Sequence, residues 1–134
     1  MISIKMKKLT KRQLNQIHNR CLNLIRRKPP TFFIFRKLSG YYGVCDYEND
    51  VVELDPRRDV VRTAYHECVH YLYPNWSETQ VLYAESRLIN VLSVLDVALF
   101  LKYLSDKLYK SELKKVCLEK RKKKKKKIYK NIKR

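Results

Sequence analysis

The 134-residue sequence predicts a single α+β domain, in which an N-terminal helix precedes a small three-stranded sheet and two or three further helices. Two observations carry this prediction. Apolar residues recur every three or four positions before residue 28 and after residue 56, which is the period of an amphipathic helix. Between these stretches, short segments rich in aromatic and β-branched residues alternate with turn signals, as strands do. We place this domain over residues 1–109 and a basic C-terminal segment over residues 110–134.

The N-terminal helix is expected over residues 10–28. Thr10 and Gln13 have the spacing of a capping box, in which each side chain bonds the backbone of the other residue. Apolar residues then return at steps of three and four and form one stripe: Leu14, Ile17, Cys21, Leu22 and Ile25. The proline pair at residues 29 and 30 ends this helix.

A small sheet is expected over residues 31–55. It has three strand candidates: 31–38, 41–47 and 51–54. A turn at Glu48-Asn49-Asp50 joins the second and third candidates into a β-hairpin. The tight turn at Ser39-Gly40 by itself favours a meander, with 41–47 as the central strand.

The first helix after the sheet is expected over residues 56–73. Asp55 followed by Pro56 is typical of an N-cap and a first helical position, because proline lacks only an N–H that would have no helical partner there. Pro74 ends this helix, since proline cannot continue the hydrogen-bond pattern.

The next helix is expected over residues 77–109. Ser77 and Gln80 form a second capping box at its start. Regularly spaced leucines predict that it runs without a break to residue 109. A further helix is expected over about residues 111–122, inside the C-terminal segment.

The charge is concentrated at the two ends of the chain. Lys and Arg number 31 and Asp and Glu 13, which gives a formal net charge of +18. Residues 1–30 carry +9, residues 31–109 carry −3 and residues 110–134 carry +12. The run Lys120–Lys127 predicts a solvated tail or, as the alternative, a weak and salt-sensitive contact with a polyanion such as nucleic acid or anionic lipid.

The sequence shows neither a membrane-spanning stretch nor a secretory signal, because its most apolar segment, residues 88–101, is short and interrupted by polar residues. Four cysteines occur without a CxxC pair: Cys21, Cys45, Cys68 and Cys117. We therefore expect a cytoplasmic protein with free thiols that is not transmembrane.

Residues 66–70 read His-Glu-Cys-Val-His, the pattern HExxH, within the helix expected over 56–73. Residues four apart lie on one helical face about 6 Å apart, so that His66 and His70 can bind one ion. Glu67 is rotated from that face and is suited to act as general base on a zinc-activated water. The pattern predicts a Zn²⁺ site with Glu67 as the catalytic residue.

A third ligand must come from elsewhere, and no third histidine follows the motif. If the helices expected over 56–73 and 77–109 form an antiparallel hairpin, the level of the two histidines falls near residues 82–85 of the return helix. This estimate favours Glu85 as the third metal ligand. Glu78 is the alternative, in a first turn where a carboxylate also stabilises the helix dipole.

Other side chains are weaker candidates. His18 lies near the apolar stripe of the first helix, where a packed histidine is the expected interpretation. Cys68 is expected to pack in the core, and Cys45 is the one thiol placed to mask a metal ion. Four tyrosines flank the motif in sequence as alternative oxyanion donors, and spacing does not choose among them: Tyr65, Tyr71, Tyr73 and Tyr83.

The hairpin, the His66–His70 motif helix and the following glutamate helix resemble the gluzincin metallopeptidases. The small size is most similar to the minigluzincins, the group of proabylysin and projannalysin. Thermolysin-like enzymes carry a Ser-Asp pair after the glutamate, whereas Glu85 here is followed by Ser86-Arg87, and no aspartate occurs before Asp96. The sequence therefore does not assign the residue that would accept a hydrogen bond from the second ring nitrogen of a ligand histidine.

The resemblance implies a zinc metalloendopeptidase, a hydrolase that cleaves peptides or unfolded proteins. It also implies that 41–47 is an edge strand beside the cleft, and we follow it on this point. An extended substrate would pair with that strand by β-augmentation. The substrate-binding residues expected from it are Gly43, Val44, Cys45, Asp46 and Tyr47.

In this group C-terminal segments can hold the protein latent. Residues 110–134 are opposite in charge to the middle of the chain, so we expect them to cover the site of their own chain or of a neighbour, as in a zymogen. A homodimer formed by exchange of the C-terminal helix is the corresponding assembly. The rival hypothesis is a basic nucleic-acid-binding protein with a structural or vestigial metal site.

Overall fold

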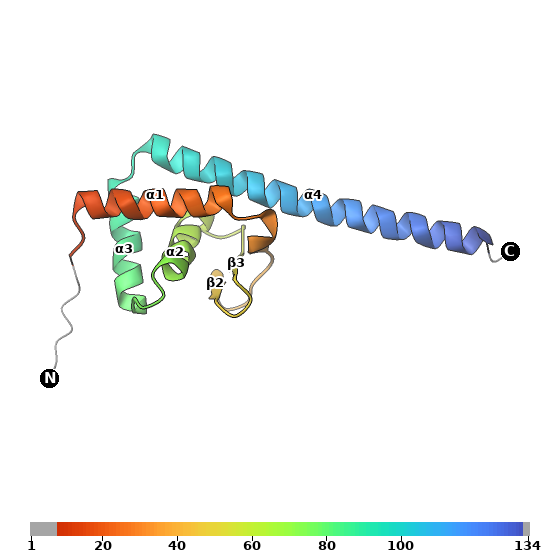
Figure 1. Ribbon diagram of the computed structural model, residues 1–134, viewed down its shortest axis with the longest axis horizontal. Helices are drawn as coiled ribbons and strands as arrows, with labels where there is room; N and C mark the ends of the chain where they lie inside the picture. Colours follow the sequence, from red (N-terminus) through yellow and green to blue (C-terminus); the bar gives the residue numbers. More distant parts are fainter. Residues whose placement is uncertain (1–7, 133–134) are drawn as a thin grey trace.

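The computed structural model describes residues 8–132, and side chains through residue 125. Over this range the chain forms four α-helices, a short 3₁₀ turn and one three-stranded sheet (Figure 1). The elements follow in the order α1 (Lys11–Arg27), η1 (Pro30–Phe32), β1 (Phe33–Phe35), β2 (Gly43–Asp46), β3 (Val51–Leu54), α2 (Val60–Leu72), α3 (Glu78–Val91) and α4 (Val94–Ile132). The predicted α+β class is confirmed.

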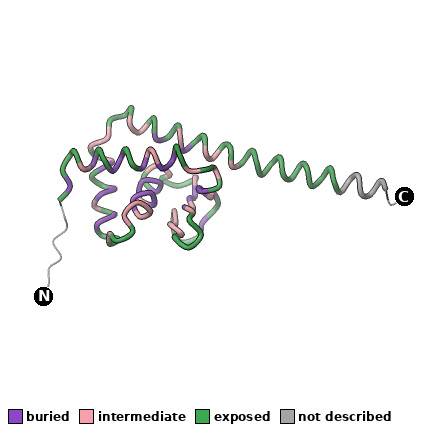
Figure 2. Tube along the Cα trace, viewed as in Figure 1, coloured by how far each residue is buried: buried purple, intermediate pink, exposed green. Residues whose placement is uncertain are grey.

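Helix α1 begins as predicted from its capping box. The Gln13 N–H donates to Thr10 Oγ1 at 3.2 Å, and the Thr10 N–H donates to Gln13 Oε1 at 2.8 Å. Most of its apolar stripe is buried against the rest of the domain: Leu14, Ile17, Cys21 and Ile25, with Leu24 beside them. Figure 2 shows this buried side in purple along α1.

The sheet has the strand order β1-β3-β2, so that β2 lies at an edge. The predicted hairpin is confirmed, because β2 pairs antiparallel with β3, with Val44 opposite Glu53. Strand β1 pairs with β3 in parallel instead. The meander suggested by Ser39-Gly40 is therefore wrong. That turn, with Gly40 at φ +84°, starts a connection that carries the chain past β3 to its far side.

Helix α2 begins at Val60, and the prediction that Asp55 and Pro56 start it is wrong. The Asp55 side chain is buried and accepts hydrogen bonds from the Leu38 N–H at 3.2 Å and the Arg57 guanidinium at 2.7 Å. These bonds hold residues 55–58 in a turn. The helix then starts after Asp59, which has the left-handed φ of 40°.

The unbroken helix expected over residues 77–109 is also wrong. Helix α3 ends at Val91, and α4 begins at Val94 in a direction 118° away. A capping box starts α4, because the Asp96 N–H donates to Ser93 Oγ at 3.1 Å and the Ser93 N–H donates to Asp96 Oδ2 at 3.3 Å. The bend returns the chain across α1, and Phe100 of α4 stacks on Tyr65 of α2 with ring centroids 3.8 Å apart.

Helix α4 includes the helix expected over residues 111–122 and continues to Ile132 as one element that projects beyond the domain (Figure 1). Within the described residues, no single helix has the length and apolar character needed to cross a bilayer. Helices α3 and α4 meet that test only as a bent pair.

Acid titration tests the role of Asp55. Hydrogen bonds from Arg57, followed by those from the Leu38 and Arg57 N–H groups, hold the pKa of Asp55 well below its usual range despite its burial. A carboxyl whose pKa is lower in the folded protein stabilises it above the unfolded pKa of about 4, and this stability is lost as the pH falls further. Urea unfolding at pH 7 and pH 3 should therefore show a larger loss of stability for the parent than for Asp55→Asn. Parallel losses would contradict the assignment.

Candidate metal centre

The motif histidines project from one face of α2. His66 and His70 are one turn apart, and their ring centroids are separated by 4.8 Å. Their side chains are largely buried, with exposed fractions of 14% and 19%. The opposite face of α2 packs into the core through Tyr65, Cys68 and Val69, which are fully buried. The helix therefore presents both imidazoles from a fixed support.

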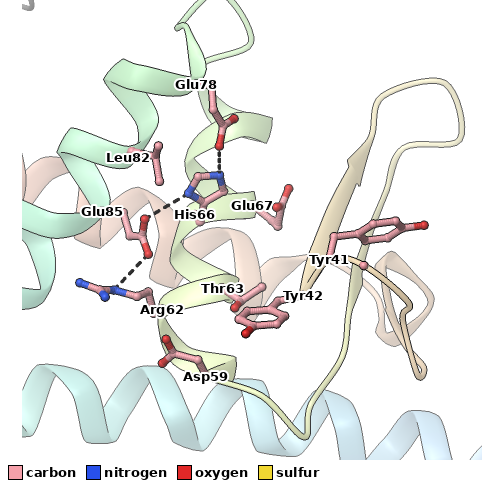
Figure 3. A pocket seen from close by; sticks show the side chains of 12 residues that line it. Tyr41, Tyr42, Asp59, Arg62, Thr63, His66, Glu67, Glu78, Leu82 and Glu85 are labelled. Carbon is pink, nitrogen blue, oxygen red and sulfur yellow. Dashed lines mark hydrogen bonds and ion pairs between the residues drawn. The ribbon is translucent and has the colours of Figure 1, made fainter.

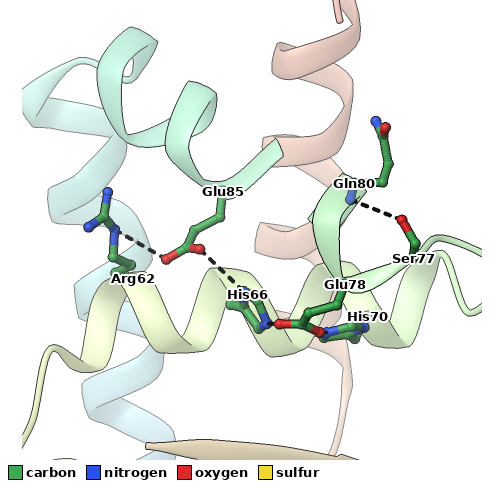
Figure 4. A network of polar contacts seen from close by, with 7 residues as sticks. All are labelled: Arg62, His66, His70, Ser77, Glu78, Gln80 and Glu85. Atoms are coloured by element: carbon green, nitrogen blue, oxygen red, sulfur yellow. Dashed lines mark hydrogen bonds and ion pairs between the residues drawn. The ribbon is translucent and has the colours of Figure 1, made fainter. Parts of the chain in front are cut away.

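Glu78 lies between the two imidazoles (Figure 4). Its Oε1 is 2.9 Å from His66 Nε2, and its Oε2 is 2.6 Å from His70 Nε2. One ligand atom from each of these three residues lies within 4.8 Å of the others. Two imidazole nitrogens and one carboxylate oxygen form a donor set that suits zinc.

Glu85 contacts the other nitrogen of His66. Its Oε2 is 3.2 Å from His66 Nδ1, and its Oε1 is 3.1 Å from Arg62 Nε. Through this contact Glu85 can fix the orientation of a ligand histidine, the support that the sequence left unassigned. The sequence preferred Glu85 as third ligand and kept Glu78 as the alternative; the geometry favours Glu78, which lies in the cluster with both histidines.

The short connection between α2 and α3 explains the difference. Tyr73 stacks on Trp76 with centroids 4.2 Å apart, as expected for residues that pack the turn. Ser77 caps α3 by accepting from the Gln80 N–H at 3.2 Å. Glu78 is consequently the first residue of α3 and lies opposite His70, whereas Glu85 lies two turns later, opposite His66.

Glu67 faces the cleft beside His66 and is 7% exposed (Figure 3). Burial raises the pKa of Glu67 to about 7, with the negative charges of Glu78 and Glu85 acting in the same direction and His66 opposing them. Burial opposes protonation of His66, but its hydrogen bond to Glu85 and the surrounding carboxylates outweigh this effect and raise the pKa of His66.

A cleft of about 550 Å³ opens over these side chains. The loop before β2 and the start of β2 form one wall, and α2 and α3 form the other (Figure 3). The sequence had not identified seven of its lining residues as part of a site: Gly40, Tyr41, Tyr42, Asp59, Arg62, Thr63 and Leu82. The two tyrosines and Leu82 are about half exposed, so the cleft offers both aromatic and aliphatic surface.

Strand β2 is close-packed against the motif helix at Gly43. A Cβ atom there would lie 2.7 Å from Thr63 Cγ2 and 3.0 Å from Glu67 Cγ. This spacing leaves no room for a side chain, so glycine sets the distance between the edge strand and Glu67. Of the other expected substrate-binding residues, Val44 and Asp46 continue the strand, and Tyr47 follows it. The Tyr47 hydroxyl donates to the His70 carbonyl oxygen at 2.5 Å.

The weaker candidates lie away from the cleft lining. His18 is buried, as expected, with Nδ1 2.9 Å from the Tyr65 hydroxyl. The Tyr71 hydroxyl donates to Asp50, and the Tyr73 hydroxyl accepts from Arg20. All four cysteines are free; Cys68 is buried as expected, and burial raises the pKa of the Cys45 thiol to about 11.

No family model matches the chain, and neither a curated protein nor a solved structure matches it.

Proposed function

We propose that the chain is a zinc-dependent metallopeptidase, as its resemblance to the minigluzincins implies. The observation that carries the proposal is the carboxylate of Glu78 between His66 Nε2 and His70 Nε2, with Glu67 beside it in an open cleft. This combination supplies three ligands and a general base within one site. The fold alone would not support a function.

The protonation of His66 supports a cation at this position. Both of its ring nitrogens face carboxylate oxygens, which only accept hydrogen bonds: Nδ1 faces Glu85 and Nε2 faces Glu78. This arrangement favours the doubly protonated ring in the absence of a metal ion, in line with the raised pKa of His66. With Nδ1–H donating to Glu85, the Nε2 of His66 would be available to hold a cation beside Glu78. The residues present therefore fit zinc, with His66, His70 and Glu78 as its ligands.

Held by His66, His70 and Glu78, a zinc ion would supply the Lewis acidity that polarises a peptide carbonyl and lowers the pKa of water toward neutrality. Glu67 then accepts a proton from the attacking water and donates it to the leaving amine. Its burial beside His66 places it within the cleft rather than in bulk solvent. Glu85, neutralised by Arg62, keeps the His66 ring in one orientation.

The shape of the cleft favours an extended peptide or an unfolded protein segment as substrate. Strand β2 pairs with β3 on one side only, so its outer edge can accept an added strand. Such a strand would run beside Glu67, because Gly43 keeps β2 close to α2. Leu82 and the two tyrosines at residues 41 and 42 would contact its side chains.

The proposed latent form requires a second chain. The residues lining the cleft come from the β2 loop, α2 and α3, and Figure 1 shows α4 leading away from the domain. Within the described part of the chain, the C-terminal segment therefore does not cover its own site. Latency and dimerisation through α4 remain a proposal in which one chain covers the cleft of another.

Zinc titration should rank the two glutamates. Glu78→Ala removes a ligand, whereas Glu85→Ala removes a group that orients one. Loss of such an orienting group lowers metal affinity by about 10- to 100-fold. We expect a larger loss for Glu78→Ala in competition titrations with a chelating dye. The reverse order would make Glu85 the ligand, as the helix-hairpin estimate first favoured.

Replacement of the general base should separate metal binding from hydrolysis. Glu67→Gln preserves the shape of the side chain but cannot accept a proton in the reaction. The variant should keep its zinc and lose cleavage of a fluorogenic unfolded protein by about 100-fold or more. Because the full chain is proposed to be latent, the same pair should also be compared in a chain truncated after residue 108. Cleavage by Glu67→Gln at the parent rate would contradict the role of Glu67.

A further inference from the structure

We propose that the outer part of α4 is an arm that binds duplex DNA through its phosphates, independently of base sequence. We define the basic arm as residues 110–125 of α4; its inner end still packs against the domain, where Lys115 Nζ donates to the Phe35 carbonyl oxygen at 3.3 Å, and its outer end, residues 120–125, projects beyond it. It carries nine Lys and Arg residues and two glutamates. This surface plays no part in the proposed peptidase reaction.

Apart from Lys115, which donates to the Phe35 carbonyl oxygen, the cations of the basic arm are available to a partner. Every side chain from residue 112 to residue 125 is exposed, and Figure 2 shows this part of α4 as a continuous green helix. One ion pair lies within it, between Lys115 and Glu112 at 2.9 Å. Among the described residues, none of the six cations at 120–125 has an ion-pair partner. Binding to phosphates would therefore not have to break internal salt bridges.

The distribution of these six cations favours a groove over a flat surface. Consecutive helical residues are rotated by about 100°, so Lys120–Lys125 distributes charge around the whole helix. A membrane surface contacts only one face of a helix, and residues 119–125 contain no apolar side chain that could insert into it. The exposed apolar residues Leu113, Val116 and Leu118 all precede that stretch.

Duplex DNA has the matching geometry. Its major groove is about 12 Å wide, admits an α-helix, and has phosphates along both sides. Single strands are a poorer match, because the basic arm contains no aromatic residue on which bases could stack. The deep and narrow major groove of A-form RNA does not admit side chains in the same way.

A second group of cations lies beside the base of the arm. Lys107 Nζ of α4 donates to the Lys28 carbonyl oxygen at 2.5 Å, and the Arg26 guanidinium of α1 lies 5.5 Å from the Tyr103 ring centroid. The basic end of α1 is thereby joined to α4, although the two segments are about 80 residues apart in sequence. This convergence extends the positive surface toward the domain, and none of these residues lines the cleft.

Fluorescence anisotropy with a labelled 20-base-pair duplex of random sequence tests the proposal on the full chain. The arm variant combines Lys122→Gln, Lys123→Gln, Lys124→Gln and Lys125→Gln, because glutamine keeps helix propensity while removing charge. Its affinity at 100 mM salt should fall at least tenfold. The slope of log K against log salt should become less steep by about 3.6, since four phosphate contacts are removed and each contributes about 0.9.

The matched control removes the same charge from exposed positions elsewhere, in a variant with Lys8, Lys11, Arg12 and Lys37 all changed to glutamine. We expect its affinity to change by less than threefold. Equal losses in the two variants would overturn the proposal, because overall charge rather than the arm would then determine binding. An unchanged affinity of the arm variant would overturn it as well.

Two further probes examine the nature of the partner. A single strand of the same length should bind more weakly than the duplex, and vesicles with about one-third phosphatidylserine should not displace the duplex. Preference for the single strand or for the vesicles would overturn the assignment to duplex DNA. The variant His66→Ala should bind the duplex like the parent, so failure of the peptidase proposal would leave this result unchanged.

Discussion

The carboxylate of Glu78, positioned between His66 Nε2 and His70 Nε2, is the contact on which the rest of the site depends. The two imidazoles lie one turn apart on α2 and share one carboxylate partner. That carboxylate belongs to Glu78, the first residue of α3. The stacked pair of Tyr73 and Trp76 shapes the turn between these helices, and the Ser77 cap fixes where α3 begins. The same register then brings Glu85 to the other nitrogen of His66.

Helix α2 has to serve two environments at once. One face buries an aromatic and aliphatic surface against α1, α3 and α4, including the Tyr65 ring stacked on Phe100. The other carries the histidines and Glu67 into the cleft. Because the buried face is held from several sides, the ligand face is fixed before any ion binds, which is what a metal site with an open position needs. The bend before α4 is part of this support, since it brings Phe100 onto Tyr65.

The features predicted correctly from sequence are those that depend on neighbouring residues. The His66–His70 spacing follows from helix geometry, and the Thr10 cap and the β2–β3 hairpin follow from local turn chemistry. The errors arose where distant contacts decide. Asp55 does not cap α2, because its side chain is buried and hydrogen-bonded to the Leu38 N–H. Strands β1 and β3 pair in parallel although they are far apart in sequence, and no local pattern indicates this pairing. The choice between Glu78 and Glu85 depends on how one loop closes. The break before α4 could have been predicted from the sequence, because Ser93 and Asp96 have the spacing of a capping box.

The most direct test of the metal centre is the zinc content of the purified chain, measured by elemental mass spectrometry together with the protein concentration. The account predicts about one zinc per chain, and loss of that zinc in the variant with both His66→Ala and His70→Ala, because a single remaining carboxylate cannot hold the ion tightly. His18→Ala is the matched control, since this histidine is buried against Tyr65, and it should keep the metal. Stoichiometric zinc in the double variant would contradict the assignment of the site.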